Sequence, residues 1–273
     1  GDNIVWAVLD SGVQQDHPDI NQLPGMDLTT NPDTVGGAPA NACDNHGTAL
    51  AGSISGIINN GLGVTGIAPH CKVVSARTFI SLEPCNGSFT GVSGTTVEAL
   101  AFAESIGAKV TNNSNSYDPI RSAAIDSKYA QTRAGGMVHF ASAGVGSNPI
   151  ANYPAWLPSV NTIAGVQRTG ARSALTNYGP DLFLVAPGED ILSTDRTGAD
   201  GYASGDYSSL TGSSLATSYT AGVAALVLSL HPARPAWAVE QILRSTAVDL
   251  GPPGFDFDFG WGMVNAHAAV VAA

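Results

Sequence analysis

The chain has 273 residues, of which 44% are hydrophobic and 12% are charged, so it can bury a sizeable core and disorder is not expected. Lys and Arg number 11 against 22 Asp and Glu, giving a formal net charge of −11 at pH 7, and no basic run offers a face for nucleic acid. The longest apolar stretch, 221–230, is about half of what a bilayer requires. We therefore expect a soluble, monomeric protein with neither a nucleic-acid nor a membrane partner. No basic segment followed by an apolar core opens the chain, so we expect that any targeting segment was removed or never present.

Short runs rich in Val, Ile and Leu alternate along the chain with Ala-rich or amphipathic stretches. The runs are mostly apolar rather than alternating, which is typical of parallel strands covered on both faces. In chain order, the predicted strands lie at 4–9, 73–76, around 110, 137–141, 160–166 and 183–186. The predicted helices lie at 47–57, 92–105, 122–134, 214–229, 235–245 and 264–271. This alternation predicts an α/β fold, a doubly wound and mostly parallel sheet with helices on both faces, in one domain over residues 1–273.

Three polar residues stand at the ends of predicted elements, and each has a structural interpretation beside a catalytic one. Asp10 follows the first strand, at the sheet edge where catalytic groups gather, although Asp before Ser-Gly also begins turns. His46 opens a helix whose positive end favours the neutral imidazole of a general base, although a capping histidine fits equally. Ser214 opens the long apolar helix, either as a plain N-cap or as a nucleophile whose amide faces an oxyanion.

The chain order of these residues favours catalysis over three separate structural roles. Asp, then His, then Ser is the order of the subtilisin triad, which differs from the order on other folds. A GxGxxG match at 61–66 follows a helix and leads toward a strand, the reverse of a dinucleotide site. An α/β-hydrolase interpretation of 212–216 fails because too little chain follows Ser214 for the missing strands.

The residues around the three positions closely resemble the signature blocks of one family. They read Asp10-Ser-Gly-Val, His46-Gly-Thr-x-x-Ala-Gly52 and Gly212-Ser-Ser214-Leu-Ala216, followed by Ala221-Gly222. These blocks are similar to those of the subtilisin-like serine peptidases, the subtilases. Further similarities, among them His17-Pro-Asp-Ile20 and Gly260-Trp-Gly262, extend the resemblance over essentially the whole chain.

The resemblance implies a serine endopeptidase that acts on extended peptides and proteins through an acyl-enzyme and needs no cofactor for catalysis. Ser214 would be the nucleophile, His46 the general base and acid, and Asp10 the group that orients His46. Two short segments match the strands that hold a substrate backbone by main-chain hydrogen bonds: Ser114, Asn115 and Ser116, and Ser142, Ala143 and Gly144.

The sequence departs from the family at the oxyanion hole. The family has an Asn after Ala-Gly whose side chain donates to the oxyanion, whereas this chain has Val145. Loss of that donor costs about 10²–10³ in kcat in subtilisin, and it leaves the Ser214 backbone N–H as the expected donor. Asn112 or Asn113 could compensate, or a local shift could bring Asn148 into place.

The block after the nucleophile departs as well, with Ser218 and Tyr219 where the family has Pro and His. Loss of the proline should relax the position of Ser214 slightly. In this family, more room there is associated with aminolysis of the acyl-enzyme. In the substrate segment, Asn115-Ser116 replaces a Leu or Trp followed by Gly, and a Cβ at Ser116 would crowd the peptide. Besides an active endopeptidase, these changes leave open an impaired or engineered enzyme acting as an acyl-transferase or esterase, and a peptide-binding pseudoprotease.

Two stabilising features are implied by the resemblance. Cys43 and Cys85 match a disulfide of the aqualysin and proteinase K branch, which would leave Cys71 buried and free and would indicate secretion into an oxidising compartment. Asp19 and loop 58–64 resemble a calcium site with these ligands: Asp19, Asn60 and the carbonyls of Ile58, Leu62 and Val64. The loop could instead be a metal-free turn. Since nothing resembles the family's prodomain, we expect the chain to be the mature catalytic domain.

Overall fold

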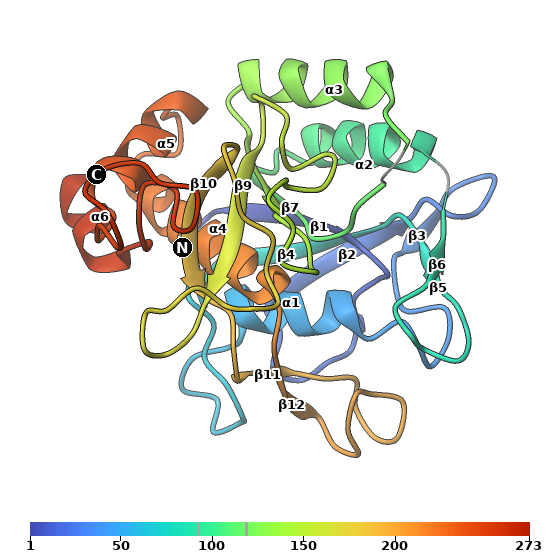
Figure 1. Cartoon of the computed structure of the whole chain (residues 1–273). Helices are drawn as coiled ribbons and strands as arrows, with labels where there is room; N and C mark the ends of the chain where they lie inside the picture. Colours follow the sequence, from blue (N-terminus) through green and yellow to red (C-terminus); the bar gives the residue numbers. More distant parts are fainter. Residues whose placement is uncertain (92, 118–119) are drawn as a thin grey trace.

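The computed structural model describes residues 1–91, 93–117 and 120–273, and its centre is a twisted sheet (Figure 1). Within these residues the sheet has 8 strands in the order β10-β9-β8-β7-β1-β4-β2-β3. Every neighbouring pair is parallel except β2 with β3. The strands are β1 (Val5–Asp10), β2 (Gln22–Asp27), β3 (Thr34–Gly36), β4 (Lys72–Arg77), β7 (Val110–Asn113), β8 (Val138–Ser142), β9 (Asn161–Val166) and β10 (Leu182–Pro187).

Helices cover both faces of this sheet (Figure 1). They are α1 (His46–Ser55), α2 (Ser93–Ser105), α3 (Ala123–Ala134), α4 (Ser213–Leu230), α5 (Ala236–Ser245) and α6 (Ala266–Ala272). Two antiparallel strand pairs lie outside the sheet, β5 (Ile80–Ser81) with β6 (Phe89–Thr90), and β11 (Ile191–Thr194) with β12 (Tyr207–Leu210).

Strand β1 shows how the sequence produces this layered arrangement. Trp6 and Val8 join a core cluster that includes residues of α1 and α4. The alternate residues, Ala7 and Leu9, join a second cluster with residues of α2 and α3. Because successive side chains of a strand point to opposite faces, a strand buried on both faces must be apolar throughout.

The predicted α/β fold and its parallel sheet are therefore confirmed. The six predicted strands correspond to β1, β4, β7, β8, β9 and β10, and the six predicted helices to α1–α6 with ends that differ by a few residues. The predicted helix start at Val92 lies outside the described residues. Strand β2 was not predicted, because its sequence Gln-Leu-Pro-Gly-Met-Asp contains Pro and Gly and reads as a loop.

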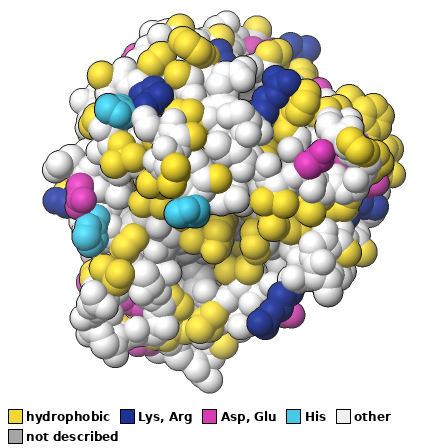
Figure 2. Space-filling model, turned by 90° about the vertical axis from the view of Figure 1, so that its left-hand side faces the viewer, with side chains coloured by type: hydrophobic (Ala, Val, Ile, Leu, Met, Phe, Trp, Pro, Cys, Tyr) yellow, Lys and Arg dark blue, Asp and Glu magenta, His cyan; other side chains and the backbone are white. Residues whose placement is uncertain are grey.

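Helix α4 is the central helix of the protein. By length and composition its 18 residues could cross a membrane, but 72% of them are buried inside the protein, so the apolar sequence reflects a core position. On the face seen in Figure 2, hydrophobic side chains are interspersed with polar ones, and Lys and Arg side chains lie apart from one another.

Candidate active site

Asp10 and His46 meet where β1 ends and α1 begins. The His46 Nδ1 atom lies 3.0 Å from Asp10 Oδ1 and 2.9 Å from Oδ2. The helix can approach this closely because its second residue is Gly47, where a Cβ would lie only 2.4 Å from the Gly12 carbonyl oxygen. Asp10 is fully buried, and its Oδ1 also accepts from the Ser11 backbone N–H at 2.8 Å.

This pairing sets the protonation behaviour of His46. Burial of the ring disfavours the charged imidazolium, but the charge of Asp10 and the hydrogen bond to it outweigh burial and raise the pKa of His46 above its ordinary value of 6.5. A carboxylate that accepts from Nδ1 also fixes the tautomer, leaving Nε2 free to take a proton.

Ser214 lies at the second residue of α4 and lines the same cleft as His46, a cavity of ≈ 540 Å³. Its backbone N–H is in the first turn of the helix, where amide groups have no intrahelical acceptor and the helix dipole favours negative charge. No hydrogen bond joins His46 to Ser214 in the part of the chain that the structure describes. Such contacts are often long in a free enzyme and shorten when substrate binds.

The cleft also contains the predicted peptide-binding segments. Ser114, Asn115 and Ser116 follow β7, and Ser142 ends β8, so both segments come from the carboxyl ends of neighbouring parallel strands. Gly144 lines the cleft as well, whereas Ala143 is fully buried beneath it. Because β7 and β8 are parallel neighbours, the two segments leave the same edge of the sheet side by side.

Val145, which the resemblance assigns to the position of the family's oxyanion amide, is 64% exposed at the cleft. The asparagines that the sequence offers as replacement donors to the oxyanion lie in other surroundings. Asn112 donates through Nδ2 to Ser114 Oγ at 3.2 Å, and Asn113 donates to the hydroxyls of Tyr117 and Tyr129 at 3.0 and 2.9 Å. Asn148 does not line the cleft within the described residues.

Ser218 supports the backbone of Ser214. Its hydroxyl donates to the Ser214 carbonyl oxygen at 3.1 Å, and this hydrogen bond stands where the family is expected to have a proline ring. Next to Ser214, Ser213 Oγ donates to the Gly144 carbonyl at 3.1 Å and lies 2.7 Å from Ser142 Oγ. These contacts tie the first turn of α4 to the predicted peptide-binding segment after β8.

Two cleft residues were missed by sequence reasoning as site residues. Asn152 lies next to Gly144, since a Cβ on that glycine would be 2.6 Å from Asn152 Nδ2, and its Oδ1 accepts from Asn177 at 3.0 Å. Tyr202 reaches the cleft from the loop between β11 and β12. No periodicity or spacing in the sequence connects either residue with Ser214, and only the packing of distant loops brings them there.

Comparison with known proteins places this geometry in a family. The sequence profile of the subtilase family (peptidase S8) matches residues 1–262. The chain belongs to the subtilase family.

Individual relatives agree over the whole chain. Subtilisin NAT of Bacillus subtilis subsp. natto is 32% identical over 276 residues, covering 98% of this chain and 66% of that protein. Subtilisin of Bacillus pumilus is also 32% identical over 276 residues, covering 98% of this chain and 91% of that protein. This subtilase thus spans about two thirds of the length of some relatives and most of the length of others.

Solved structures agree with the fold. A protease from Pseudoalteromonas arctica superposes with a TM-score of 0.86 at 28% identity, covering 99% of this chain and 90% of that one. Fervidolysin from Fervidobacterium pennivorans, described as a keratinolytic enzyme related to subtilisin, superposes with a TM-score of 0.84 at 26% identity, covering 99% and 42%.

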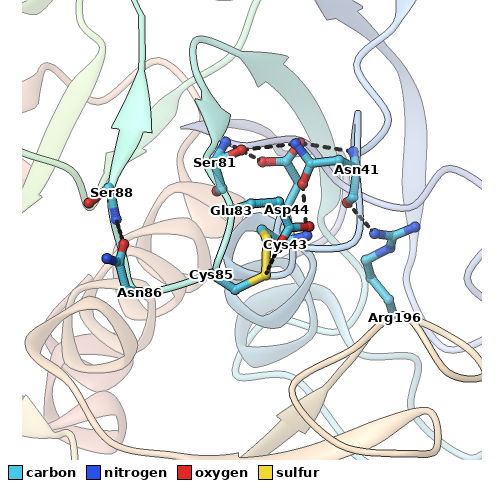
Figure 3. The surroundings of a disulfide bond; sticks show 9 residues. All are labelled: Asn41, Cys43, Asp44, Ser81, Glu83, Cys85, Asn86, Ser88 and Arg196. Atoms are coloured by element: carbon cyan, nitrogen blue, oxygen red, sulfur yellow. Dashed lines mark hydrogen bonds between the residues drawn. A yellow bond between two sulfur atoms is a disulfide. The ribbon is translucent and has the colours of Figure 1, made fainter.

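The disulfide implied by the resemblance is confirmed in this subtilase, because Cys43 and Cys85 are bonded with a Cα–Cα distance of 4.9 Å (Figure 3). Asp44 reinforces the link: its carboxylate accepts from the Ser81 N–H at 2.7 Å and from the Ala40 N–H at 2.9 Å. The bond joins the segment before α1 to the β5–β6 pair, and both cysteines line the cleft. It therefore holds one wall of the cleft to the helix that carries His46.

The third cysteine, Cys71, is buried and free as expected. Burial, partly offset by a contact with Ser55, raises its pKa to about 11, so the thiol stays protonated and unreactive at neutral pH.

Four of the residues assigned to calcium, Asp19, Asn60, Leu62 and Val64, lie together in this subtilase. Asp19 is fully buried, and its carboxylate accepts from Asn60 Nδ2 at 2.6 Å and from the Val64 N–H at 3.0 Å. Asn60 Oδ1 accepts from the Leu62 N–H at 2.9 Å. The oxygen donors suit a hard cation, but here they are hydrogen-bonded as in a metal-free turn. Calcium would have to replace the Asn60 amide as the partner of Asp19.

Proposed function

We propose that this chain is a serine endopeptidase with Asp10, His46 and Ser214 as its catalytic residues. The observation that carries the proposal is that His46, which lies 2.9 Å from Asp10, lines one cleft with Ser214 at a helix N-terminus. Membership of the subtilase family and the likeness to subtilisins support it.

In this mechanism Ser214 Oγ bonds to the scissile carbonyl carbon while its proton passes to His46 Nε2. The resulting imidazolium is stabilised by the Asp10 carboxylate. When the tetrahedral intermediate collapses, the C–N bond breaks and His46 returns the proton to the leaving amine. Water then attacks the Ser214 ester by the same proton route, releasing the acid and restoring the hydroxyl.

The oxyanion is the weak point of this mechanism. The Ser214 N–H at the start of α4 is the donor we assign to it, and Val145 adds none. Ester substrates are intrinsically more reactive than amides, so they tolerate a poorer oxyanion hole. The exposed Val145 therefore favours a second candidate function, an esterase or acyl-transferase with a low rate on amides.

We further propose extended peptides and proteins as substrates, held between the segments after β7 and β8. The Cys43–Cys85 disulfide supports action in an oxidising, extracellular compartment. The acidic net charge of −11 supports the absence of a nucleic-acid partner. We propose that the chain acts as a monomer.

The test is labelling with a fluorophosphonate together with hydrolysis of a peptide ester and the matching peptide anilide. An endopeptidase is labelled at Ser214 and hydrolyses both, and Ser214→Ala abolishes labelling and turnover. Hydrolysis of the ester alone supports the second candidate. If the wild type is neither labelled by the fluorophosphonate nor able to hydrolyse either substrate, it behaves like Ser214→Ala. This result supports a peptide-binding pseudoprotease instead of an enzyme.

Calcium at the loop 58–64 is a separate proposal, supported by the oxygen donors around Asp19. Isothermal titration with calcium on protein dialysed against a chelator measures it directly. Heat released by the wild type and lost in Asp19→Asn supports binding. An equal absence of heat in both shows that hydrogen bonds close the loop without a metal.

A further inference from the structure

The loop between β11 and β12, residues 195–206, places one aromatic side chain in the cleft. Tyr202 lines the cleft together with Gly201, His46 and Ser214, and its side chain is 49% exposed. The triad mechanism described above gives this ring no task. A half-exposed aromatic ring beside reacting groups is well suited to contact a bound ligand.

The loop is internally fixed around a buried carboxylate. Asp195 is fully buried and accepts from the Arg196 N–H at 2.8 Å and from the Ala203 N–H at 2.9 Å. Gly201 packs so closely on this carboxylate that a Cβ there would lie 2.6 Å from it. The two residues that flank Tyr202 are thus both held by Asp195, so the ring is presented from a defined backbone.

External contacts determine where the loop lies. Arg196 Nη1 donates to the Asn41 carbonyl at 2.5 Å, beside the disulfide (Figure 3). The Thr197 N–H donates to Gln14 Oε1 at 2.9 Å. Strand β11, which precedes the loop, packs on α1, where Thr194 Oγ1 donates to the Thr48 carbonyl at 2.7 Å. The loop is therefore anchored to α1 and to the turn after β1.

This anchoring separates the loop from the peptide-binding segments. Those segments follow β7 and β8, which lie on one side of β1 in the sheet. A peptide whose acyl part lies between them and whose carbonyl carbon meets Ser214 continues past His46 on the other side. That direction carries the leaving-group residues toward the Tyr202 loop.

The rim of the cleft offers a second apolar group. Val145 is 64% exposed and lines the cleft with Tyr202 and Ser214. Leu175 is also exposed, by 54%, and its carbonyl accepts from the N–H of Gly146, the residue after Val145. Val145 and Leu175 are thus exposed aliphatic residues on adjoining segments, and Val145 is the one that lines the cleft.

The hydroxyl of Tyr202 stays neutral. Although the residue is half exposed, desolvation of its hydroxyl, together with the negative charges of Asp10 and Asp195, raises the pKa of Tyr202 above its ordinary value of 10.0. The side chain therefore offers an uncharged ring and one O–H donor. The ring suits packing against an apolar side chain of a bound peptide, and the O–H suits donation to a neighbouring peptide carbonyl.

We propose that Tyr202 is a specificity-determining residue that selects aromatic or large aliphatic side chains on the leaving-group side of the scissile bond. The inference rests on the proposed endopeptidase activity and identifies part of its substrate class. Packing of an apolar side chain on the exposed ring favours such leaving groups over glycine by about tenfold.

The test is digestion of a degenerate peptide pool, with the residues on both sides of each new terminus identified by mass spectrometry. We expect large apolar residues to be enriched in the first two leaving-group positions of wild-type products. Tyr202→Ala should lower this enrichment about tenfold relative to glycine, whereas Tyr202→Phe keeps it. Ser204→Ala, an exposed position of the same loop, is the matched control and should keep the leaving-group profile.

The outcomes distinguish this proposal from the proposed function. If Tyr202→Ala yields the wild-type leaving-group profile, or alters only the acyl-side profile, Tyr202 does not select the leaving group. A general fall in product with unchanged profiles indicates a structural role and also overturns the proposal. If the wild type forms no products beyond those of Ser214→Ala, the endopeptidase activity fails, and this proposal fails with it.

Discussion

Val145 is an exposed aliphatic residue at the cleft, and the proposed mechanism has no oxyanion donor from its side chain. A donor aimed at the developing oxyanion contributes mainly in the transition state, so its replacement lowers turnover more than binding. Asn112 and Asn113 are not among the described residues that line the cleft, and their amides donate to Ser114 and to two tyrosine hydroxyls. We therefore expect the side chain at position 145 to limit the rate of amide hydrolysis.

Restoring the donor should raise activity. We expect Val145→Asn to increase kcat on a peptide anilide by about 10²-fold, because one oxyanion hydrogen bond is worth about that much. Val145→Ala, which removes bulk without adding a donor, should give no such increase. Steady-state kinetics on the anilide measure both. Equal kcat in wild type and Val145→Asn would mean that another donor already serves the oxyanion.

A second prediction concerns the charge of His46. Its pKa is raised above 6.5, and only the neutral ring accepts a proton, so kcat/KM should rise with pH along an acid limb whose midpoint lies above 6.5. Asp10→Asn removes the negative charge that raises the pKa of His46 against the effect of burial. The midpoint should therefore move to lower pH, and kcat should fall by about 10⁴. Asp16→Asn, an exposed carboxylate nearby, should retain the wild-type midpoint. An unmoved midpoint in Asp10→Asn contradicts the pairing.

At the scale of elements, the site depends on how α1 is held. Gly47 allows the helix to approach the turn after β1, and the Cys43–Cys85 bond ties the preceding segment to the β5–β6 pair. Asp44 adds hydrogen bonds to Ser81 and Ala40 across the same junction. Both cysteines line the cleft, so loss of the disulfide should alter this wall of the cleft as well as the stability of the fold.

The double substitution Cys43→Ser with Cys85→Ser should lower the free energy of unfolding by about 4 kcal/mol, because it frees the unfolded chain from a loop with a sequence separation of 42. Urea denaturation with and without reductant measures this. Reductant should shift the wild type and Cys71→Ala toward the double variant and leave the double variant unchanged. A wild type that is insensitive to full reduction would rule out this stabilisation.

At the scale of the whole molecule, a buried histidine couples stability to pH. His139 in β8 is fully buried between Thr111 Oγ1, 2.7 Å from Nδ1, and Thr132 Oγ1, 2.9 Å from Nε2. Burial, aided by the positive charge of Arg133, lowers its pKa to about 3 from 6.5. The folded protein therefore keeps this ring neutral where the unfolded chain protonates it.

The sign of the effect follows from proton binding. Above pH 6.5 both states hold His139 neutral, so its contribution is complete there, and it is lost as pH falls from 6.5 toward 3. Wild type should lose about 1.4 kcal/mol more per pH unit than His139→Gln in this range. Chemical denaturation at several pH values compares the two slopes, in which shared carboxylate effects cancel. Parallel slopes would show that His139 does not stay neutral in the fold.

The sequence alone determined the parallel sheet, six of its strands and all six helices, because strands buried on both faces are continuously apolar. It also singled out Asp10, His46 and Ser214, since each follows or opens a regular element within a recognisable block. Strand β2 was missed because its Pro and Gly give no strand signal, and only its pairing with β4 makes it a strand. The resemblance indicated the disulfide partners, which periodicity could not.

Tertiary structure decided what surrounds these residues. Tyr202 and Asn152 lie far from Ser214 in sequence and reach the cleft through loops whose positions depend on contacts with Asn41, Gln14 and Asn177. Other hydrogen bonds commit Asn112 and Asn113 to internal partners and turn Asn60 toward Asp19. Local sequence specifies an element through its own backbone and periodicity. A side chain's partner across the cleft depends on long-range packing, which local periodicity does not encode.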